Sequence, residues 1–188
     1  MKQKKVVVLL AEGFEEIEAV SIVDVLRRAE QDVCMAAVAD AATVSGAHGI
    51  VVSADAKLSE LNSAELDMVV LPGGMPGAIN LAENAAVRTL LFEAYANGGI
   101  VAAICAGPLA LHAAGLLNER RVTAYPSVRD QLAGAVYTGH DVECDQRIIT
   151  GKGPGSALIF SVTLVRELGF AQRADEIAKG MLCPFSVF

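Results

Sequence analysis

The chain has 188 residues, of which 53% are hydrophobic and 20% charged, as is typical of a globular protein with a large buried core. Its 15 basic and 22 acidic residues give a formal net charge of −7, which disfavours a nucleic-acid surface. The apolar runs are strand-sized, and acidic residues follow the basic N-terminus too soon for a signal peptide, so we expect a cytoplasmic protein without a membrane span.

Strands and helices alternate along the chain. Residues 5–10 form a continuous β-branched apolar run, which predicts a parallel strand covered on both faces. Further strands are expected at about 32–38, 67–71, 100–105 and 121–126. Helices are expected at about 15–28, 85–97, 108–114, 156–168 and 171–181. The alternation predicts a single α/β domain over residues 1–188, a mostly parallel sheet sandwiched between helices.

Two hairpins are predicted outside this alternation. The first covers residues 45–53, where a glycine-rich turn precedes alternating apolar residues, and it could also be an edge excursion. Within it, His48 stands between glycines, and we interpret it as a solvent-exposed turn residue, with anion binding near an active site as the alternative. The second hairpin covers residues 142–150 and turns around Asp145-Gln146.

The first predicted helix carries acidic residues in its first turn, where they complement the helix dipole. Glu18 is expected at the edge of the buried face, next to Ile17. That face is expected to consist of Ile17, Val20, Ile22, Val23 and Leu26.

The strand at 67–71 ends in a glycine-rich loop that includes Gly73 and Gly74. Ligands bind beyond the carboxyl ends of strands in open α/β sheets, and glycines let the backbone approach them closely. The alternative is a plain turn.

Cys105 is the residue around which we build the functional prediction. It ends a predicted buried strand and is flanked two residues away by the small Ala103 and Gly107, which is the steric pattern of a nucleophile elbow. The N–H groups and positive dipole end of the following helix are expected to favour the thiolate. The alternative is an inert core cysteine.

Several cofactor and metal sites are disfavoured by spacing. The four cysteines, at 34, 105, 144 and 183, include no C-x-x-C pair, which argues against a zinc site, a thioredoxin motif or a disulfide framework. Residues 151–156 lack the Walker spacing, and residues 11–16 lack G-x-G-x-x-G and carry three carboxylates that would repel a pyrophosphate. No metal and no organic cofactor are therefore expected.

An activating partner for Cys105 is sought among histidines and carboxylates. His112 is about two helical turns away, and His48 and His140 cannot be placed from sequence. If the first strand lies beside the Cys105 strand, Glu15, Glu16 or Glu18 reaches the same crevice. Such a glutamate must be protonated and donate to the sulfur, because an ionised carboxylate would raise the thiol pKa. The alternative is that these acids only decorate a helix N-terminus.

Four separated motifs now resemble a known family. They are Ala11-x-Gly13-x-Glu15-Glu16-x-Glu18, Leu71-Pro72-Gly73-Gly74, Ala102-Ala103-Ile104-Cys105-Ala106-Gly107-Pro108 and Gly153-Pro154-Gly155. Together they are similar to the ThiJ/PfpI superfamily, and within it to the branch of the parkinsonism-associated protein deglycase and its bacterial relatives. The resemblance spans nearly the whole chain.

The resemblance implies a flavodoxin-like sandwich, a homodimer and a set of site residues. It implies that Cys105 is an oxidisable nucleophile and that Glu18 is the protonated glutamate beside it. It also implies an oxyanion pocket of Gly73, Gly74 and the N–H of Ala106, with a loop at Gly153-Pro154 lining the site. The implied activities are cofactor-free glyoxalase chemistry, deglycation of early glycation adducts, and redox sensing or chaperone protection.

Three positions depart from the family pattern. Ala106 stands where the protease branch has histidine, so a peptidase is not expected. Tyr125 stands where the deglycase has histidine, and a tyrosine is not a base near neutral pH, with a reference pKa of about 10. His48 stands where the deglycase has an arginine near the anion site, which weakens the expectation of an anionic substrate.

Three hypotheses follow. In the first, the protein is an enzyme in which Cys105 attacks an α-oxoaldehyde or an early glycation adduct and Glu18 moves the proton. In the second, it is a non-enzymatic stress sensor or chaperone that signals through oxidation of Cys105. In the third, the fold serves only for association.

Overall fold

A computed structural model describes residues 2–184 of the chain. Residue 1 and residues 185–188 of the predicted domain lie outside the described residues. No helix in the described part is both long and apolar enough to cross a membrane.

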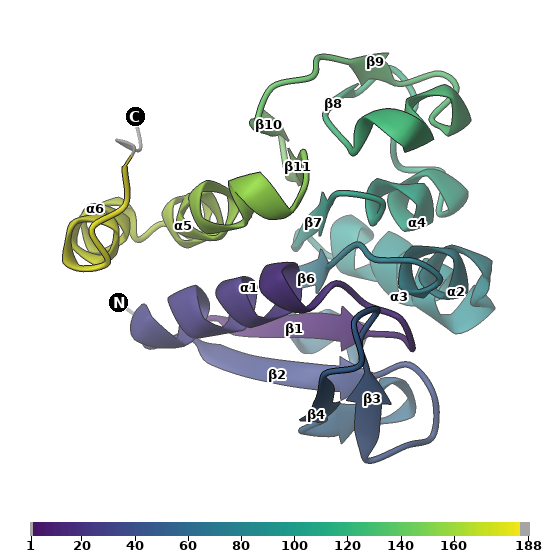
Figure 1. Cartoon of the computed structure of the whole chain (residues 1–188), viewed down its shortest axis with the longest axis horizontal. Helices are drawn as coiled ribbons and strands as arrows, with labels where there is room; N and C mark the ends of the chain where they lie inside the picture. Colours follow the sequence, from purple (N-terminus) through teal and green to yellow (C-terminus); the bar gives the residue numbers. More distant parts are fainter. Residues whose placement is uncertain (1, 185–188) are drawn as a thin grey trace.

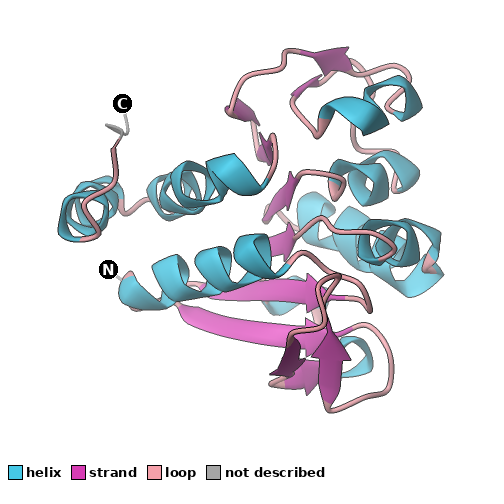
Figure 2. Ribbon diagram, in the orientation of Figure 1, coloured by secondary structure: helices cyan, strands magenta, loops and turns pink. Residues whose placement is uncertain are grey.

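A twisted sheet forms the centre of the molecule (Figures 1 and 2). Within the described residues it has seven strands in the order β10-β11-β7-β6-β1-β2-β5. Neighbouring strands are parallel except for the antiparallel pair β10 and β11. The strands are β1 (Lys5–Leu10), β2 (Asp32–Ala37), β5 (Ala56–Lys57), β6 (Met68–Leu71), β7 (Ile100–Ile104), β10 (Val142–Asp145) and β11 (Ile148–Gly151).

Helices cover both faces of the sheet. One layer is α1 (Glu16–Arg28), α5 (Ala157–Glu167) and α6 (Ala171–Gly180), and the other is α2 (Gly77–Glu83), α3 (Ala85–Ala96) and α4 (Pro108–Ala113). Alternate residues of β1 enter the two cores, as the two-residue period of a strand requires. The predicted sandwich of a mostly parallel sheet between helices is confirmed.

Both predicted hairpins are present. The first is formed by β3 (Thr43–Ser45) and β4 (Val51–Ser53), and the second by β10 and β11. The predicted strand at 121–126 is shorter, since β8 covers only Arg121–Val122 and pairs with β9 (Val136–Tyr137) outside the main sheet. The short helix α2 was not predicted, because its first residue is a glycine within a run that has the composition of a turn.

One expectation about the first helix is wrong, and the condition set on the order of the strands is not met. Ile17 and Val20 were expected on its buried face but are 59% and 52% exposed, because the buried side of α1 is centred on Glu18, Ile22 and Val25. The first strand does not lie beside the Cys105 strand, since β6 pairs with both β1 and β7 and separates them. The carboxyl ends of β1, β6 and β7 nevertheless meet at one edge of the sheet.

Candidate active site

Cys105 lies at a sharp turn between β7 and α4. Its φ of 63° is in the left-handed region that side chains seldom adopt, and its N–H donates to Gly151 O at 2.9 Å. Two residues later, a Cβ at Gly107 would lie 2.7 Å from Leu71 O, so the turn needs a glycine there. The elbow geometry predicted from Ala103 and Gly107 is therefore present, with the cysteine 8% exposed.

The sulfur of Cys105 receives hydrogen bonds from the backbone N–H groups of Ala106 and Gly74. These bonds lower the thiol pKa, as was expected for a cysteine at the start of a helix. Burial and the neighbouring Glu18 carboxylate have a larger effect and raise the pKa of Cys105 to about 12. The expectation of a favoured thiolate is thus wrong, because burial, reinforced by the Glu18 carboxylate, outweighs the two N–H groups.

Glu18 enters the site from the first turn of α1 and is completely buried. Its Oε2 accepts the N–H of Gly73 at 2.7 Å, whereas its buried Oε1 has no nitrogen or oxygen partner among the described residues. Burial raises the pKa of Glu18 to about 7, against the opposing effect of hydrogen bonds from Gly73 and Cys105. The pKa of the acid and the pKa of the thiol therefore each depend on the protonation state of the other group.

The loop after β6 is shaped to let these groups meet. A Cβ at Gly73 would lie 2.6 Å from Cys105 Cβ and 2.9 Å from Glu18 Oε2. Gly74 has φ +88°, and a Cβ there would lie 2.4 Å from Glu15 N. The loop thus brings together the predicted site residues Gly73, Gly74 and Cys105. The N–H of Gly73, however, donates to Glu18 and not to the predicted oxyanion pocket.

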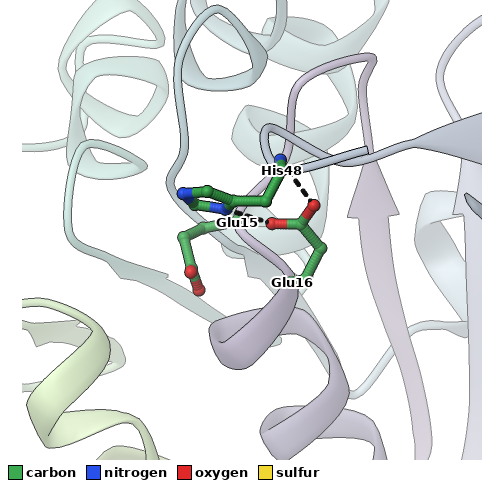
Figure 3. Close-up of side chains that lie close together, drawn as sticks. All are labelled: Glu15, Glu16 and His48. Carbon is green, nitrogen blue, oxygen red and sulfur yellow. Dashed lines mark hydrogen bonds and ion pairs between the residues drawn. The ribbon is translucent and has the colours of Figure 1, made fainter. Parts of the chain in front are cut away.

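Glu15 and Glu16 are also part of the interior, at 7% and 4% exposed, and do not merely decorate the helix terminus. Glu16 Oε1 accepts His48 N at 2.7 Å and Ile50 N at 3.4 Å, and Oε2 lies 2.7 Å from His48 Nδ1 (Figure 3). Burial works to raise the pKa of Glu16, but hydrogen bonds from His48 lower it overall. His48 itself is exposed, and its pKa is raised by Glu16.

Glu15, Glu16 and His48 are the residues of the described chain best placed to share a metal ion, with one ligand atom each within 4.8 Å of the others. The atoms that would bind a metal already have partners in the protein. Glu16 Oε2 lies against His48 Nδ1, and Glu15 Oε2 accepts the N–H of Glu18 at 2.7 Å. The contacts between Glu16 and His48 tie α1 to the β3–β4 hairpin. The absence of a metal or cofactor requirement stays a prediction.

The remaining predicted site residues lie on two loops beside the elbow. Tyr125 N–H donates to Cys105 O at 2.8 Å, and the tyrosine is 47% exposed. A Cβ at Gly153 would lie 3.3 Å from Tyr125 Cδ2, which places that loop against the ring. Pro154 follows as the first residue of a short 3₁₀ helix, Pro154–Ser156, and is partly buried.

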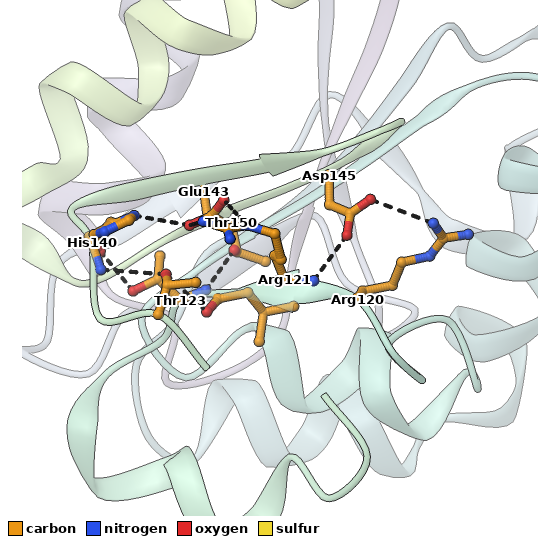
Figure 4. Close-up of polar contacts among 9 residues, drawn as sticks. Arg120, Arg121, Thr123, His140, Glu143, Asp145 and Thr150 are labelled. Atoms are coloured by element: carbon orange, nitrogen blue, oxygen red, sulfur yellow. Dashed lines mark hydrogen bonds and ion pairs between the residues drawn. The ribbon is translucent and has the colours of Figure 1, made fainter. Parts of the chain in front are cut away.

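A polar network that sequence reasoning missed positions the segment before Tyr125 (Figure 4). Thr123 N–H donates to Thr150 Oγ1 at 2.8 Å, and Thr123 Oγ1 donates to His140 O at 2.6 Å. Glu143 accepts from Arg121 Nε at 3.0 Å and lies 3.0 Å from His140 Nδ1. No sequence signal marks this network, because its members come from separate loops and strands.

A cavity of about 700 Å³ lies elsewhere, between the segment after β5 and the first turns of α3. Lys57, Asn62 and Thr89 are among its lining residues, which include none of the residues around Cys105. The arrangement at the elbow is built from a thiol, an acid and two N–H donors.

Comparisons with known proteins agree in assigning the chain to one group. The model of the DJ-1/PfpI family matches residues 4–167. The chain is 37% identical to Protein DJ-1 homolog A of Arabidopsis thaliana over 95% of its own length but only 46% of that protein. It is 35% identical to Glutathione-independent glyoxalase DJR-1.2 of Caenorhabditis elegans, covering 94% of this chain and 95% of that one.

Among solved structures, the fold is similar to "Toxoplasma gondii DJ-1, oxidized", with a TM-score of 0.92 and 38% identity. That match covers 97% of this chain and 100% of the other.

Proposed function

The chain belongs to the DJ-1/PfpI family, and from that premise we propose that it is a cysteine-dependent glyoxalase or deglycase that needs no cofactor. Its substrates are α-oxoaldehydes or early glycation adducts, and its role is protection under stress. The observation that carries the proposal is the buried Glu18 carboxyl, with a pKa of about 7, held against the Cys105 thiol. The name of the Caenorhabditis elegans relative, a glutathione-independent glyoxalase, supports the same reaction class.

The first step forms a carbon–sulfur bond. With the shared proton on Glu18, the Cys105 thiolate attacks the aldehyde carbon of methylglyoxal, and Glu18 gives its proton to the aldehyde oxygen. The N–H groups of Gly74 and Ala106 stabilise the developing oxyanion. Gly73 holds Glu18 through its own N–H and takes no part in that pocket.

The second step moves two protons between adjacent carbons and their oxygens. The Glu18 carboxylate removes the proton from the sulfur-bearing carbon and returns it to the neighbouring carbon, while the hydroxyl proton of the sulfur-bearing carbon passes to the ketone oxygen, so the aldehyde carbon is oxidised and the ketone carbon reduced. The product is a lactate thioester on Cys105. Water then cleaves the carbon–sulfur bond, which releases lactate and restores the thiol. Tyr125, Gly153 and Pro154 line the mouth of the site.

Lactate formation from methylglyoxal by purified protein tests the proposal, without glutathione or added metal. We expect turnover in the wild type and in Cys34→Ser, a matched change at another partly buried cysteine. Wild-type turnover no higher than that of Cys105→Ser would contradict the proposal. Deglycation is tested separately, by hydrolysis of a preformed methylglyoxal hemithioacetal while aminoguanidine traps the free aldehyde.

A second candidate function is redox sensing. The two N–H groups at the sulfur suit sulfinate oxygens as well as an oxyanion. Oxidation of the thiolate by two equivalents of peroxide gives the sulfinate and two waters. Intact-mass analysis after mild peroxide should place two oxygens on Cys105 before the other cysteines. Glu18→Gln separates the candidates, since it abolishes turnover if catalysis is the role and only shifts oxidation if sensing is.

We also propose a homodimer. Ile17 and Val20 lie one turn apart on the outer face of α1, and Ile50 lies beside that turn because its N–H reaches Glu16. These side chains are 59%, 52% and 57% exposed, and Val51 is 60% exposed. Singly exposed apolar residues are ordinary, but a cluster across two elements fits an interface between copies of the chain.

We further propose a cytoplasmic location and a single domain. All four cysteines are unpaired, which suits a reducing cytoplasm and the free thiol that the chemistry needs. We propose that residues 1–188 act as one domain. The chain spans less than half of the Arabidopsis relative reported above. The activity and partners of the whole protein are therefore also proposals.

A further inference from the structure

A closed ring of three hydrogen bonds holds the acid of the site. Glu15 N–H donates to Gly73 O at 2.9 Å, Gly73 N–H donates to Glu18 Oε2 at 2.7 Å, and Glu18 N–H donates to Glu15 Oε2 at 2.7 Å. The ring joins the start of α1 to the loop after β6. Both the backbone and the side chain of Glu15 belong to it, although the proposed reaction gives this residue no task.

Glu15 and its neighbour Glu16 differ in the group that each carboxylate affects. Both residues are buried, but Glu16 is committed to His48 and the β3–β4 hairpin. The negative charge of Glu15 raises the pKa of Glu18, in the same direction as burial. The pKa of Cys105 responds to Glu18 and to the N–H groups of Ala106 and Gly74.

The elements around Glu18 supply few other charges. Among the described residues, Glu15 from the start of α1 and Cys105 from the end of β7 are the titratable groups that shift its pKa. The loop after β6 contributes only the backbone N–H of Gly73. A negative charge beside Glu18 therefore favours placing the second negative charge on the sulfur and the proton on the acid.

We propose that Glu15 is a positioning residue that fixes the Glu18 carboxyl against Cys105 and shifts the shared proton towards Glu18, which makes the thiolate of Cys105 more available. The inference deepens the proposed function, on which it rests for the task of the Glu18–Cys105 pair. The inference can be tested without turnover, because it concerns only the proton on Glu18 and the thiolate of Cys105.

Neutral and charged replacements of Glu15 test this role. Glu15→Gln keeps an oxygen acceptor for Glu18 N–H, and Glu15→Ser keeps a good N-cap, but both lack the charge. Glu15→Asp keeps both the cap and the charge. The readouts are the titration of the Glu18 carboxyl by carbon-13 NMR and the rate of Cys105 alkylation by iodoacetamide across pH.

For Glu15→Gln and Glu15→Ser, we expect the Glu18 titration midpoint to fall by about half a pH unit and alkylation at neutral pH to slow about threefold. Glu15→Asp should restore the wild-type behaviour. Glu16→Gln is the matched control, because it removes an equally buried charge from the next residue, and it should leave both readouts unchanged.

Wild-type midpoints and alkylation rates in folded Glu15→Gln and Glu15→Ser would overturn the inference, as would an equal shift in Glu16→Gln. Circular dichroism establishes that each variant is folded, and the serine variant serves if the glutamine variant is not. Neither readout requires turnover. A wild type that makes no lactate would overturn the proposed function and leave this result standing.

Discussion

At the scale of single residues, the proposed chemistry depends on one proton shared between Glu18 and Cys105. Glu18 is completely buried with a pKa of about 7, and burial together with the ionised form of Glu18 raises the pKa of Cys105 to about 12. Protonation of the acid removes the part of this rise that comes from Glu18 and makes the thiolate more accessible. Backbone groups, not a histidine, supply the remaining polar contacts of the sulfur.

Gly73→Ala should displace this pair. The new Cβ would lie 2.6 Å from Cys105 Cβ and 2.9 Å from both Ala106 N and Glu18 Oε2, so these groups must move apart. Misplacement of this size reduces turnover on the order of 100-fold, which a methylglyoxal assay would measure. Gly180→Ala, where a Cβ meets nothing within 4 Å, is the control and should keep wild-type turnover. Equal turnover in the two variants would contradict the prediction.

Glu18 should also make the protein less stable as pH rises. Its pKa is raised from 4.5 to about 7 by burial, so between these values the folded state holds a proton that the unfolded state has lost. The contribution to the free energy of unfolding falls by about 3 kcal/mol across that window. Urea unfolding at pH 5 and pH 8 measures it.

The control for this pH dependence is Glu18→Gln, which cannot titrate and should lose that part of the change. His48, whose pKa is also raised, contributes equally to both proteins and cancels in the difference. A wild type and a variant with the same pH dependence would show that Glu18 is not protonated in the folded state.

At the scale of elements, the β3–β4 hairpin is held to α1 chiefly by Glu16. Its carboxylate accepts two backbone N–H groups of the hairpin, His48 N and Ile50 N, besides the imidazole. A Cβ at Gly46 would lie 2.3 Å from Glu16 Cδ, so the hairpin backbone closes directly over the side chain. The backbone contacts, and not the exposed imidazole, are expected to fix the hairpin.

Glu16→Ala should lower the free energy of unfolding by about 2 kcal/mol, because it leaves hairpin N–H groups without their acceptor. His48→Ala removes only the exposed ring and should have a much smaller effect. Urea unfolding of both variants, with hydrogen exchange of the Ile50 amide, measures the difference. If the histidine variant were the less stable of the two, the imidazole contact would be the main attachment.

At the scale of the whole molecule, the sheet separates two cores, and the outer face of α1 is left apolar. Ile17 and Val20 are exposed there because the opposite side of the helix is used to bury Glu18 and the core residues. The burial of Glu18 and the exposure of Ile17 and Val20 thus both follow from the orientation of α1. The active site and the proposed dimer face lie on opposite sides of one helix.

Val20→Asp should convert the protein from dimer to monomer, because a charge would be buried at the centre of the proposed interface. Light scattering after size exclusion measures the mass against the 19.6 kDa of one chain. Phe92→Asp is the control, since Phe92 on α3 is 59% exposed, against 52% for Val20, but lies on the other helical layer. A monomeric wild type, or dissociation by both variants, would contradict the proposal.

The sequence alone predicted the layered α/β architecture, since each continuous apolar run and each helical period reflects local chain geometry. It also identified Cys105, because an elbow needs small residues such as Ala103 and Gly107 at fixed spacing. The same local signals located the glycine loop and the acidic first turn of α1. These features depend only on neighbouring residues.

Only the tertiary structure decided how these pieces combine. It placed β6 between β1 and β7, turned Glu18 inward in place of Ile17 and Val20, and gave the N–H of Gly73 to Glu18. It also set the pKa of Glu18, because burial and charge come from segments far apart in the chain. Periodicity assigns the polar side of a helix to solvent, and the buried Glu18 departs from that rule because its partner Gly73 lies outside the helix.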